Sequence, residues 1–146
     1  GPVHSVQAQM RRTPLHTLEA EDWATALLEF ESGAIGVMSA TTADFPGGTE
    51  SIRIQGTKAN AHLEAGILTL NHLDGRAEEF GASAATGGGA DPMAFTHDWH
   101  MGVLEDFAQA IKENRAPLCS GREALAVHRV IDAMERAAKS AGKVKL

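Results

Sequence analysis

Residues 23–42 read WATALLEF-ESG-AIGVMSATT, and this stretch decides the fold. Two apolar runs enclose the short turn Glu31-Ser32-Gly33, in which the glycine tolerates a positive φ. This arrangement is typical of a β-hairpin. The flanking residues follow a similar pattern, with strands expected at 5–10, 51–55, 59–64, 67–73 and 76–80. Because six or seven strands are joined by short turns such as Ala65-Gly66 and Asp74-Gly75, they predict a mainly antiparallel sheet.

The second half of the chain has the three- and four-residue spacing of helices. A helix over 98–114 is expected to bury an apolar stripe and to end at Asn114, before Pro117. The stripe consists of Met101, Leu104, Phe107, Ala108 and Ile111. Ser120-Gly121-Arg122-Glu123 is a capping box that predicts a second helix over 121–141, with Gly142 as its C-terminal cap. Residues 143–146 are expected to form a last edge strand.

Strands in one block followed by helices in another predict an α+β fold. We expect an open, mainly antiparallel sheet of about six strands, with two helices packed on one face and the other face available for association. All 146 residues are expected to form one domain, with strands at about 3–80. The segment 81–92 contains Gly87-Gly88-Gly89 and little to bury, so it predicts a flexible loop. It lacks the lysine and the strand-to-helix setting of a phosphate-binding loop.

The apolar faces of the two hairpin strands predict self-association. Residues 23–30 and 34–42 carry apolar side chains on both faces, and helices can cover only one face of an open sheet. The other face must meet a second domain or a second copy of the chain. A sandwich that closes on itself is the alternative, although few strands remain for a second sheet.

Composition restricts the partners and the compartment. The net charge of −6 argues against binding to a nucleic-acid backbone, and no apolar run is long enough for a membrane helix. The single cysteine, Cys119, allows no internal disulfide and is expected to be a small buried residue in a cytoplasmic protein. The start at Gly1-Pro2, without an initiator methionine, suggests a fragment; these two residues are native or remain from a cleaved tag.

Several pieces of the chain resemble one family when taken in order. They are Asp22–Gly36, Ile52–Ala59 with its Gly-Thr after a strand, and the helix–loop–helix segment from His100 to Ala124. Together they are similar to the C-terminal domain of oxidoreductases named after glucose–fructose oxidoreductase, inositol dehydrogenase and a rhizopine-catabolism protein (Gfo/Idh/MocA). The resemblance covers nearly the whole chain except 81–92.

The resemblance implies what this chain does and what it lacks. Family members have an N-terminal Rossmann domain that binds NAD or NADP, and a C-terminal sheet that lines the substrate cleft and often mediates oligomers. Their catalytic Glu-Lys-Pro and Asp-x-x-x-His motifs are absent here, as is G-x-G-x-x-G. Since Val3–Ala8 is similar to the strand after the Asp-x-x-x-His helix, the chain is expected to start just downstream of the catalytic motif. It would carry no catalytic and no cofactor-binding residue, and NAD or NADP would bind only to the full-length parent.

His97 and His100 are the candidate substrate-binding residues. They stand at the start of the first helix, where imidazoles can hydrogen-bond the hydroxyls of a sugar, cyclitol or other polyol. Two alternatives remain open. His100 could pack beside Leu104 while His97 is merely exposed, or the His-x-x-His spacing could hold a metal with Asp91 or Asp98. We expect no metal, because the family needs none for hydride transfer.

Other polar residues are assigned to structure. His128 is expected to be half-buried on the second helix, while Arg11 and Arg12 are expected to be solvated rather than to hold an anionic substrate. Trp23 is expected in the core or at an interface.

Two functions therefore remain open at this point. The first is a substrate-cleft and oligomerisation domain of an NAD(P)-dependent oxidoreductase, inactive when isolated. The second is a stand-alone dimeric binding or scaffold module without enzymatic activity.

Overall fold

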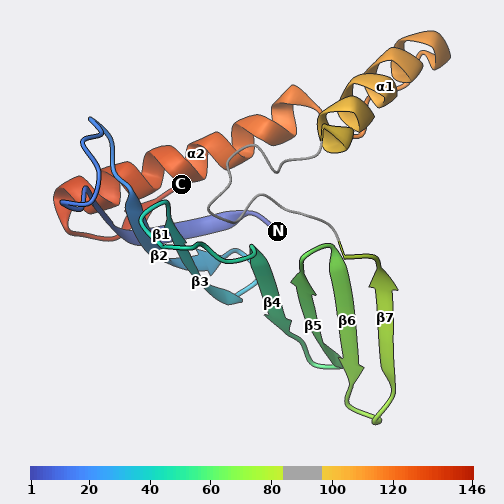
Figure 1. The fold of residues 1–146 in the computed structure, drawn as a ribbon, viewed down its shortest axis with the longest axis horizontal. Helices are drawn as coiled ribbons and strands as arrows, with labels where there is room; N and C mark the ends of the chain where they lie inside the picture. The colour runs from blue at the N-terminus through green and yellow to red at the C-terminus, as the bar shows by residue number, and fades with distance from the viewer. Residues whose placement is uncertain (84–96) are drawn as a thin grey trace. The chain divides into compact units, whose positions relative to one another are not determined.

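The computed structural model of the chain describes residues 1–83 and 97–146. Within these ranges it has two helices and eight strands, which form two antiparallel sheets of four strands each (Figure 1). The chain divides into two compact units, one formed by Gly1–Ala43 and His100–Leu146 and the other by Asp44–Trp99. The α+β class is confirmed, but the strands are divided between two sheets instead of forming one.

The first unit contains one sheet with strand order β3-β2-β1-β8. Its strands are β1 (Val3–Arg11), β2 (Trp23–Phe30), β3 (Ile35–Thr41) and β8 (Val144–Lys145). The predicted β2–β3 hairpin is confirmed, because Leu27 pairs with Val37 and Gly33 adopts a φ of 84° in the turn. The predicted edge strand near the C-terminus is confirmed as β8.

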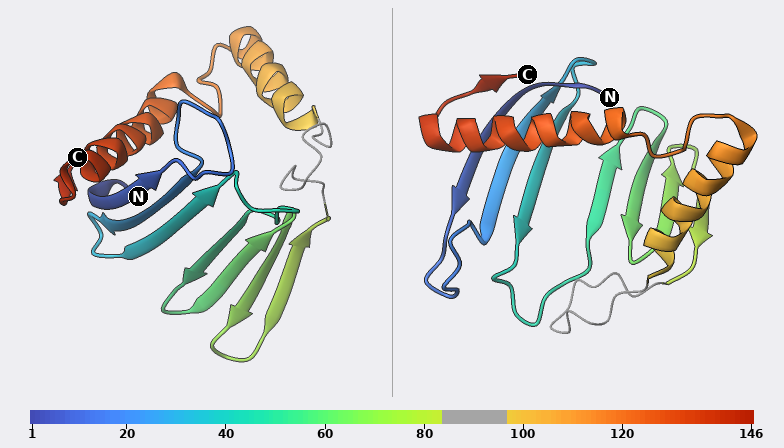
Figure 2. Two further views of the ribbon diagram at one scale, coloured as in Figure 1. Left: turned by 60° about the vertical axis from the view of Figure 1, so that its left-hand side comes forward. Right: turned by 90° about the horizontal axis from the view of Figure 1, so that it is seen from above.

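Helix α2 (Gly121–Ser140) covers one face of this sheet (Figure 2). The buried contact is made by small and flexible side chains, which let the helix approach the strands closely. The sheet contributes Val6, Ala8 and Ala26, and the helix contributes Ala133, Met134 and Ala137. This cluster is the hydrophobic core of the first unit.

Local sequence signals define both ends of α2. The Ser120 side chain accepts a hydrogen bond from the Glu123 N–H, and the Glu123 carboxylate accepts one from the Ser120 N–H at 3.0 Å, so the capping box is confirmed. At the other end, the left-handed residue is Ala141, with a φ of 52°, and not the predicted Gly142. Gly142 instead donates its N–H to the Ala137 carbonyl at 3.3 Å.

The second face of this sheet has no helix over it in the part of the chain that the structure describes. Leu27, Ile35 and Val37 have exposed fractions of 56%, 85% and 77% on that face. Trp23 is partly buried on the same face, directly across from Arg11.

The second unit contains a meander with strand order β4-β5-β6-β7. Its strands are β4 (Ser51–Gln55), β5 (Ala59–Glu64), β6 (Ile67–His72) and β7 (Ala77–Gly81), and the predicted turns at Ala65-Gly66 and Asp74-Gly75 lie between them. One face is apolar and largely exposed, with cross-strand neighbours Ile52, Leu63, Leu68 and Phe80. The sheets separate where 42–50 carry Pro46 and Gly47-Gly48, which do not support a continuous ladder.

Helix α1 (Asp98–Glu113) differs from the prediction in its burial. The expected apolar stripe stays exposed, with exposed fractions of 64% for Leu104, 54% for Phe107 and 66% for Ile111; only Ala110 of this helix is buried. The helix ends as predicted at Asn114, which has a φ of 51°. Within the described ranges, neither helix combines the length and apolar content that a transmembrane span requires.

Candidate functional site

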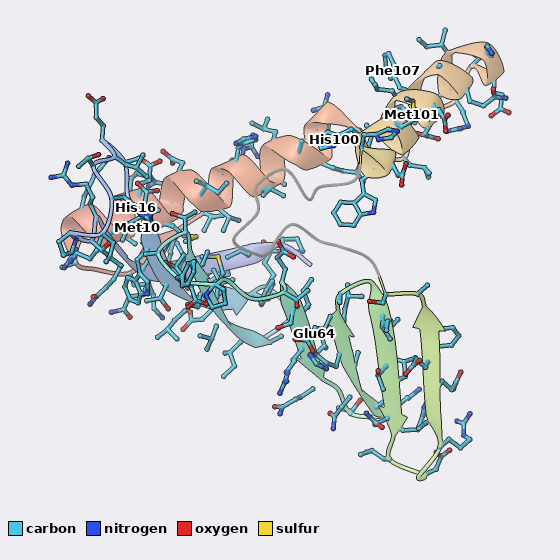
Figure 3. The ribbon with its side chains drawn as sticks, in the orientation of Figure 1. Met10, His16, Glu64, His100, Met101 and Phe107 are labelled. Atoms are coloured by element: carbon cyan, nitrogen blue, oxygen red, sulfur yellow. The ribbon has the colours of Figure 1, made fainter. Side chains whose placement is uncertain are left out.

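The two candidate histidines lie at the start of α1. His97 immediately precedes the helix and His100 occupies its first turn, as the label in Figure 3 shows. His97 Nε2 lies 3.7 Å from Asp98 Oδ1, with exposed side-chain fractions of 83% and 77%. His100 is also exposed, so both imidazoles are accessible to a ligand.

The surroundings of these histidines are apolar. Trp99, Met101, Val103 and Leu104 expose about half of their surface or more around the first turns of α1. In Figure 3, Met101 and Phe107 are seen on the same helix as His100. A site here would combine imidazole hydrogen-bonding groups with apolar surface that suits the C–H faces of a sugar or polyol.

The metal alternative gains no support from the described residues. Across 1–83 and 97–146, no group of three or more His, Cys, Asp or Glu side chains is arranged to hold a metal ion. Asp91, one of the further ligands considered, lies outside the described residues.

A second polar cluster, which the sequence did not reveal, surrounds Asp22. Its side chain is fully shielded from solvent and accepts hydrogen bonds from Thr13 N at 2.7 Å and Thr13 Oγ1 at 2.6 Å. His16 Nδ1 lies 3.0 Å from Asp22 Oδ2. The bonds from Thr13, followed by the one from His16, lower the pKa of Asp22 below its usual 3.8. Asp22 therefore ties the loop between β1 and β2 to the end of the sheet.

A third cluster joins the two chain ends of the first unit. Glu29 accepts hydrogen bonds at 2.6 Å from both Lys143 Nζ and Ser5 Oγ. The Lys143 bond is the main cause that lowers the pKa of Glu29. Because Lys143 precedes β8, this contact holds the C-terminal strand beside β1.

Asp106 organises the connection between the helices. It accepts a hydrogen bond from the Leu118 N–H at 2.7 Å and another from Arg115 Nη2 at 2.7 Å. The Leu118 bond, followed by the one from Arg115, lowers the pKa of Asp106. Cys119, next in the chain, is exposed, so the prediction that it is a buried residue is wrong.

The remaining histidines have structural surroundings. His72 Nε2 bonds Glu78 Oε1 at 2.7 Å, while His62 Nε2 lies 3.7 Å from Glu64 Oε2 without forming a hydrogen bond. His128 is exposed on α2, so the prediction that it is half-buried is wrong.

The model of an oxidoreductase family, described as its C-terminal alpha/beta domain, matches residues 1–146. The chain belongs to this family, Gfo/Idh/MocA. A comparison with curated protein sequences finds no match.

Solved structures support the fold of this Gfo/Idh/MocA domain. An oxidoreductase from Agrobacterium radiobacter in complex with NAD+, L-tartaric acid and magnesium is 21% identical, with a TM-score of 0.76. A levoglucosan dehydrogenase in complex with NADH and levoglucosan is 17% identical, with a TM-score of 0.78. The WlbA dehydrogenase from Bordetella pertussis in complex with NADH and UDP-GlcNAcA is 24% identical, with a TM-score of 0.72.

The coverage of these matches is unequal. The match with the Agrobacterium radiobacter oxidoreductase covers 99% of this chain and 44% of the solved chain. The match with levoglucosan dehydrogenase covers 100% and 45%, and the match with WlbA covers 100% and 39%. The domain therefore spans less than half the length of these relatives.

The residues of this domain do not fit a nicotinamide dinucleotide. Such cofactors bind where a parallel strand leads through a glycine-rich turn into a helix. The strand pairs in the described residues are antiparallel, and the sequence has no G-x-G-x-x-G. No step of hydride transfer is therefore assigned to this chain.

Proposed function

We propose that this chain is the substrate-facing and self-associating domain of an NAD(P)-dependent oxidoreductase that acts on a sugar, cyclitol or related polyol. The observation that carries the proposal is the family match over all 146 residues, together with coverage of less than half of NADH-bound sugar dehydrogenases. The remaining part of a full-length parent would bind the cofactor and supply the acid–base groups. The isolated domain is then expected to be inactive.

In this proposal, His97 and His100 hydrogen-bond substrate hydroxyls. Their exposure and their place at the start of α1, with apolar surface around them, support this role. Each imidazole nitrogen can donate or accept according to its protonation. The two residues would position the substrate and would not take part in the chemical step.

Kinetics of the full-length parent test this role. His100→Ala is expected to raise KM for the polyol roughly tenfold, the value of about one hydrogen bond, and to change kcat much less. His128→Ala, an exposed histidine on α2, is the matched control and should leave both parameters unchanged. An unchanged KM in both His97→Ala and His100→Ala would contradict the assignment.

Self-association through the open face of the first sheet is the second part of the proposal. Leu27, Ile35 and Val37 form an exposed apolar patch there, and such patches commonly mark interfaces. Light scattering should give a mass above 15.4 kDa for the chain. Val37→Glu should shift that mass towards the monomer, whereas Val127→Glu, at an exposed position on α2, should not. A monomer at high concentration would count against the interface.

A further inference from the structure

Within residues 1–83 and 97–146, strand β1 has a free edge beyond the short strand β8. It pairs with β2 along its length, but with β8 only through Ser5 and Val6. The Leu146 N–H donates to the His4 carbonyl at 3.1 Å, so the backbone groups of His4 in β1 point towards β8. Because these directions alternate along a strand, the other even-numbered residues of β1 also point to this side. Past Val6, the backbone groups of Ala8 and Met10 therefore face the free edge.

A groove of about 310 Å³ follows this edge, within the first unit. Ala8, Ala138 and Ala141 give it an apolar wall, since the last turn of α2 ends here. Its polar groups come from Gln7, Gln9, Arg11 and Thr25. This volume lies at the small end of the range for sites that bind small molecules.

The polar groups share one face of β1. Gln7, Gln9 and Arg11 are alternate residues, so their side chains point to the same side at intervals of about 7 Å. Thr25 is the cross-strand neighbour of Gln9. Two carboxamides, a hydroxyl and a guanidinium thus line this face of β1 over about 14 Å, so a six-carbon ligand can contact neighbouring members of the row but does not span it.

Arg11 lacks a carboxylate partner among the described residues. Its Nη1 donates to the Met10 carbonyl at 3.0 Å, and no ion pair joins it to an acidic side chain within 1–83 and 97–146. The other guanidinium nitrogens remain available to an anion. A carboxylate matches this fork with two parallel hydrogen bonds.

We propose that the groove binds a small hydroxylated carboxylate, of the size and kind of a sugar acid. Arg11 would hold the carboxylate, and Gln9, its neighbour in the row, together with the outward backbone groups of Ala8, would hold hydroxyls. The alanine wall would contact the C–H groups of the ligand. A neutral polyol would leave the guanidinium without a partner, and only two outward-facing residues are too few to bind a peptide as an added strand.

This site is separate from the proposed substrate contacts. His100 lies on α1, whereas the groove lies between β1, β2 and the last turn of α2. Leu27 lines the groove and also belongs to the exposed apolar patch of the same sheet face, whereas Ile35 and Val37 of that patch lie on β3, at the other edge of the sheet. The inference does not depend on the proposed function and needs no cofactor.

Isothermal titration of the 146-residue chain with D-gluconate tests the proposal. D-Glucitol, which has the same carbon chain without the carboxylate, is the matched ligand. We expect saturable binding of gluconate and binding of glucitol that is at least roughly tenfold weaker, because a charge-assisted pair is lost. Absence of saturable gluconate binding, or equal binding of the two ligands, would overturn the proposal.

Variants locate the binding in the groove. Arg11→Gln should weaken gluconate binding roughly tenfold or more, and Gln9→Ala should weaken it less. Arg136→Gln, which removes an exposed guanidinium paired with Asp132 on α2, should leave binding unchanged. If Arg11→Gln lowers the thermal stability, Arg11→Lys retains the charge without the planar fork and should show intermediate affinity. Equal losses in Arg11 and Arg136 variants would place the binding elsewhere and refute the site.

Discussion

His16 Nδ1 lies 3.0 Å from the carboxylate of Asp22, a group that is fully shielded from solvent. Together with Thr13, this pair fastens the loop between β1 and β2. Asp22 also donates its own N–H to the Arg11 carbonyl at 3.1 Å, and its carbonyl accepts from Thr42 N at 3.0 Å. One residue therefore connects the loop, the end of β1 and the end of β3.

Asp22→Asn is expected to lower the stability of the fold at pH 7 and to make that stability less dependent on pH in the acid range. The folded-state pKa of Asp22 lies below 3.8, so its ionised form stabilises the fold above that pH. This contribution is lost as the pH falls from 3.8 through the lower folded-state value. Thermal unfolding at pH 7 and pH 3 should show a smaller difference between the two pH values in the variant than in the wild type. Asp132→Asn, on the exposed surface of α2, should retain the wild-type difference.

Met134→Ala is expected to destabilise the first unit by about 2–5 kcal/mol. Its side chain is 4% exposed and packs in the cluster with Val6 and Ala8, so truncation leaves a cavity. Ile131→Ala is the control, because Ile131 is 43% exposed on the same helix. Denaturant unfolding should give a clearly smaller loss for the control. Equal losses would show that the α2–sheet contact is not the core.

Ser120→Ala should cost about 1 kcal/mol by removing the N-terminal cap of α2. The variant loses the bond from Glu123 N–H to the Ser120 hydroxyl, whereas the backbone N–H of residue 120 can still donate to the Glu123 carboxylate. Ser120→Asp keeps an acceptor at this position and should retain most of the stability. The free energy of unfolding, measured by circular dichroism in denaturant, distinguishes the two variants.

Gly81→Ala and Gly75→Ala form a matched pair. Both glycines have a positive φ, 94° and 90°, which costs an alanine about 1 kcal/mol. A Cβ at Gly81 would also overlap the Gly66 carbonyl oxygen, whereas a Cβ at Gly75 meets open space. Gly81→Ala should therefore destabilise the second unit more than Gly75→Ala does. Similar thermal shifts in both variants would refute the close contact between β7 and the Ala65-Gly66 turn.

Local signals predicted much of the fold. The β2–β3 hairpin is encoded by Gly33 between two apolar runs, and the start of α2 by Ser120 and Glu123, because these structures form among neighbouring residues. The left-handed end of α2 lies at Ala141, one residue before the predicted Gly142, because Ala141 adopts a conformation that glycine normally favours.

Longer-range features could not be predicted from such signals. The exposure of Phe107 depends on which surfaces α1 contacts. The apolar periodicity of α1 in the sequence is the same whether or not a partner covers the helix. The Asp22 cluster joins Thr13 and His16 through an irregular loop, which has no repeating pattern. The sequence shows Asp22 directly before β2, but this position does not indicate that Thr13 and His16 are its partners.

The central claim is that this domain carries substrate-side functions while the rest of its parent binds the cofactor. Titration of NADH, followed by its fluorescence, tests this claim most directly when the 146-residue chain and the full-length parent are compared. We expect saturable binding to the parent and none to the isolated chain. Saturable NADH binding to the isolated chain, or its absence from the folded parent, would contradict the account.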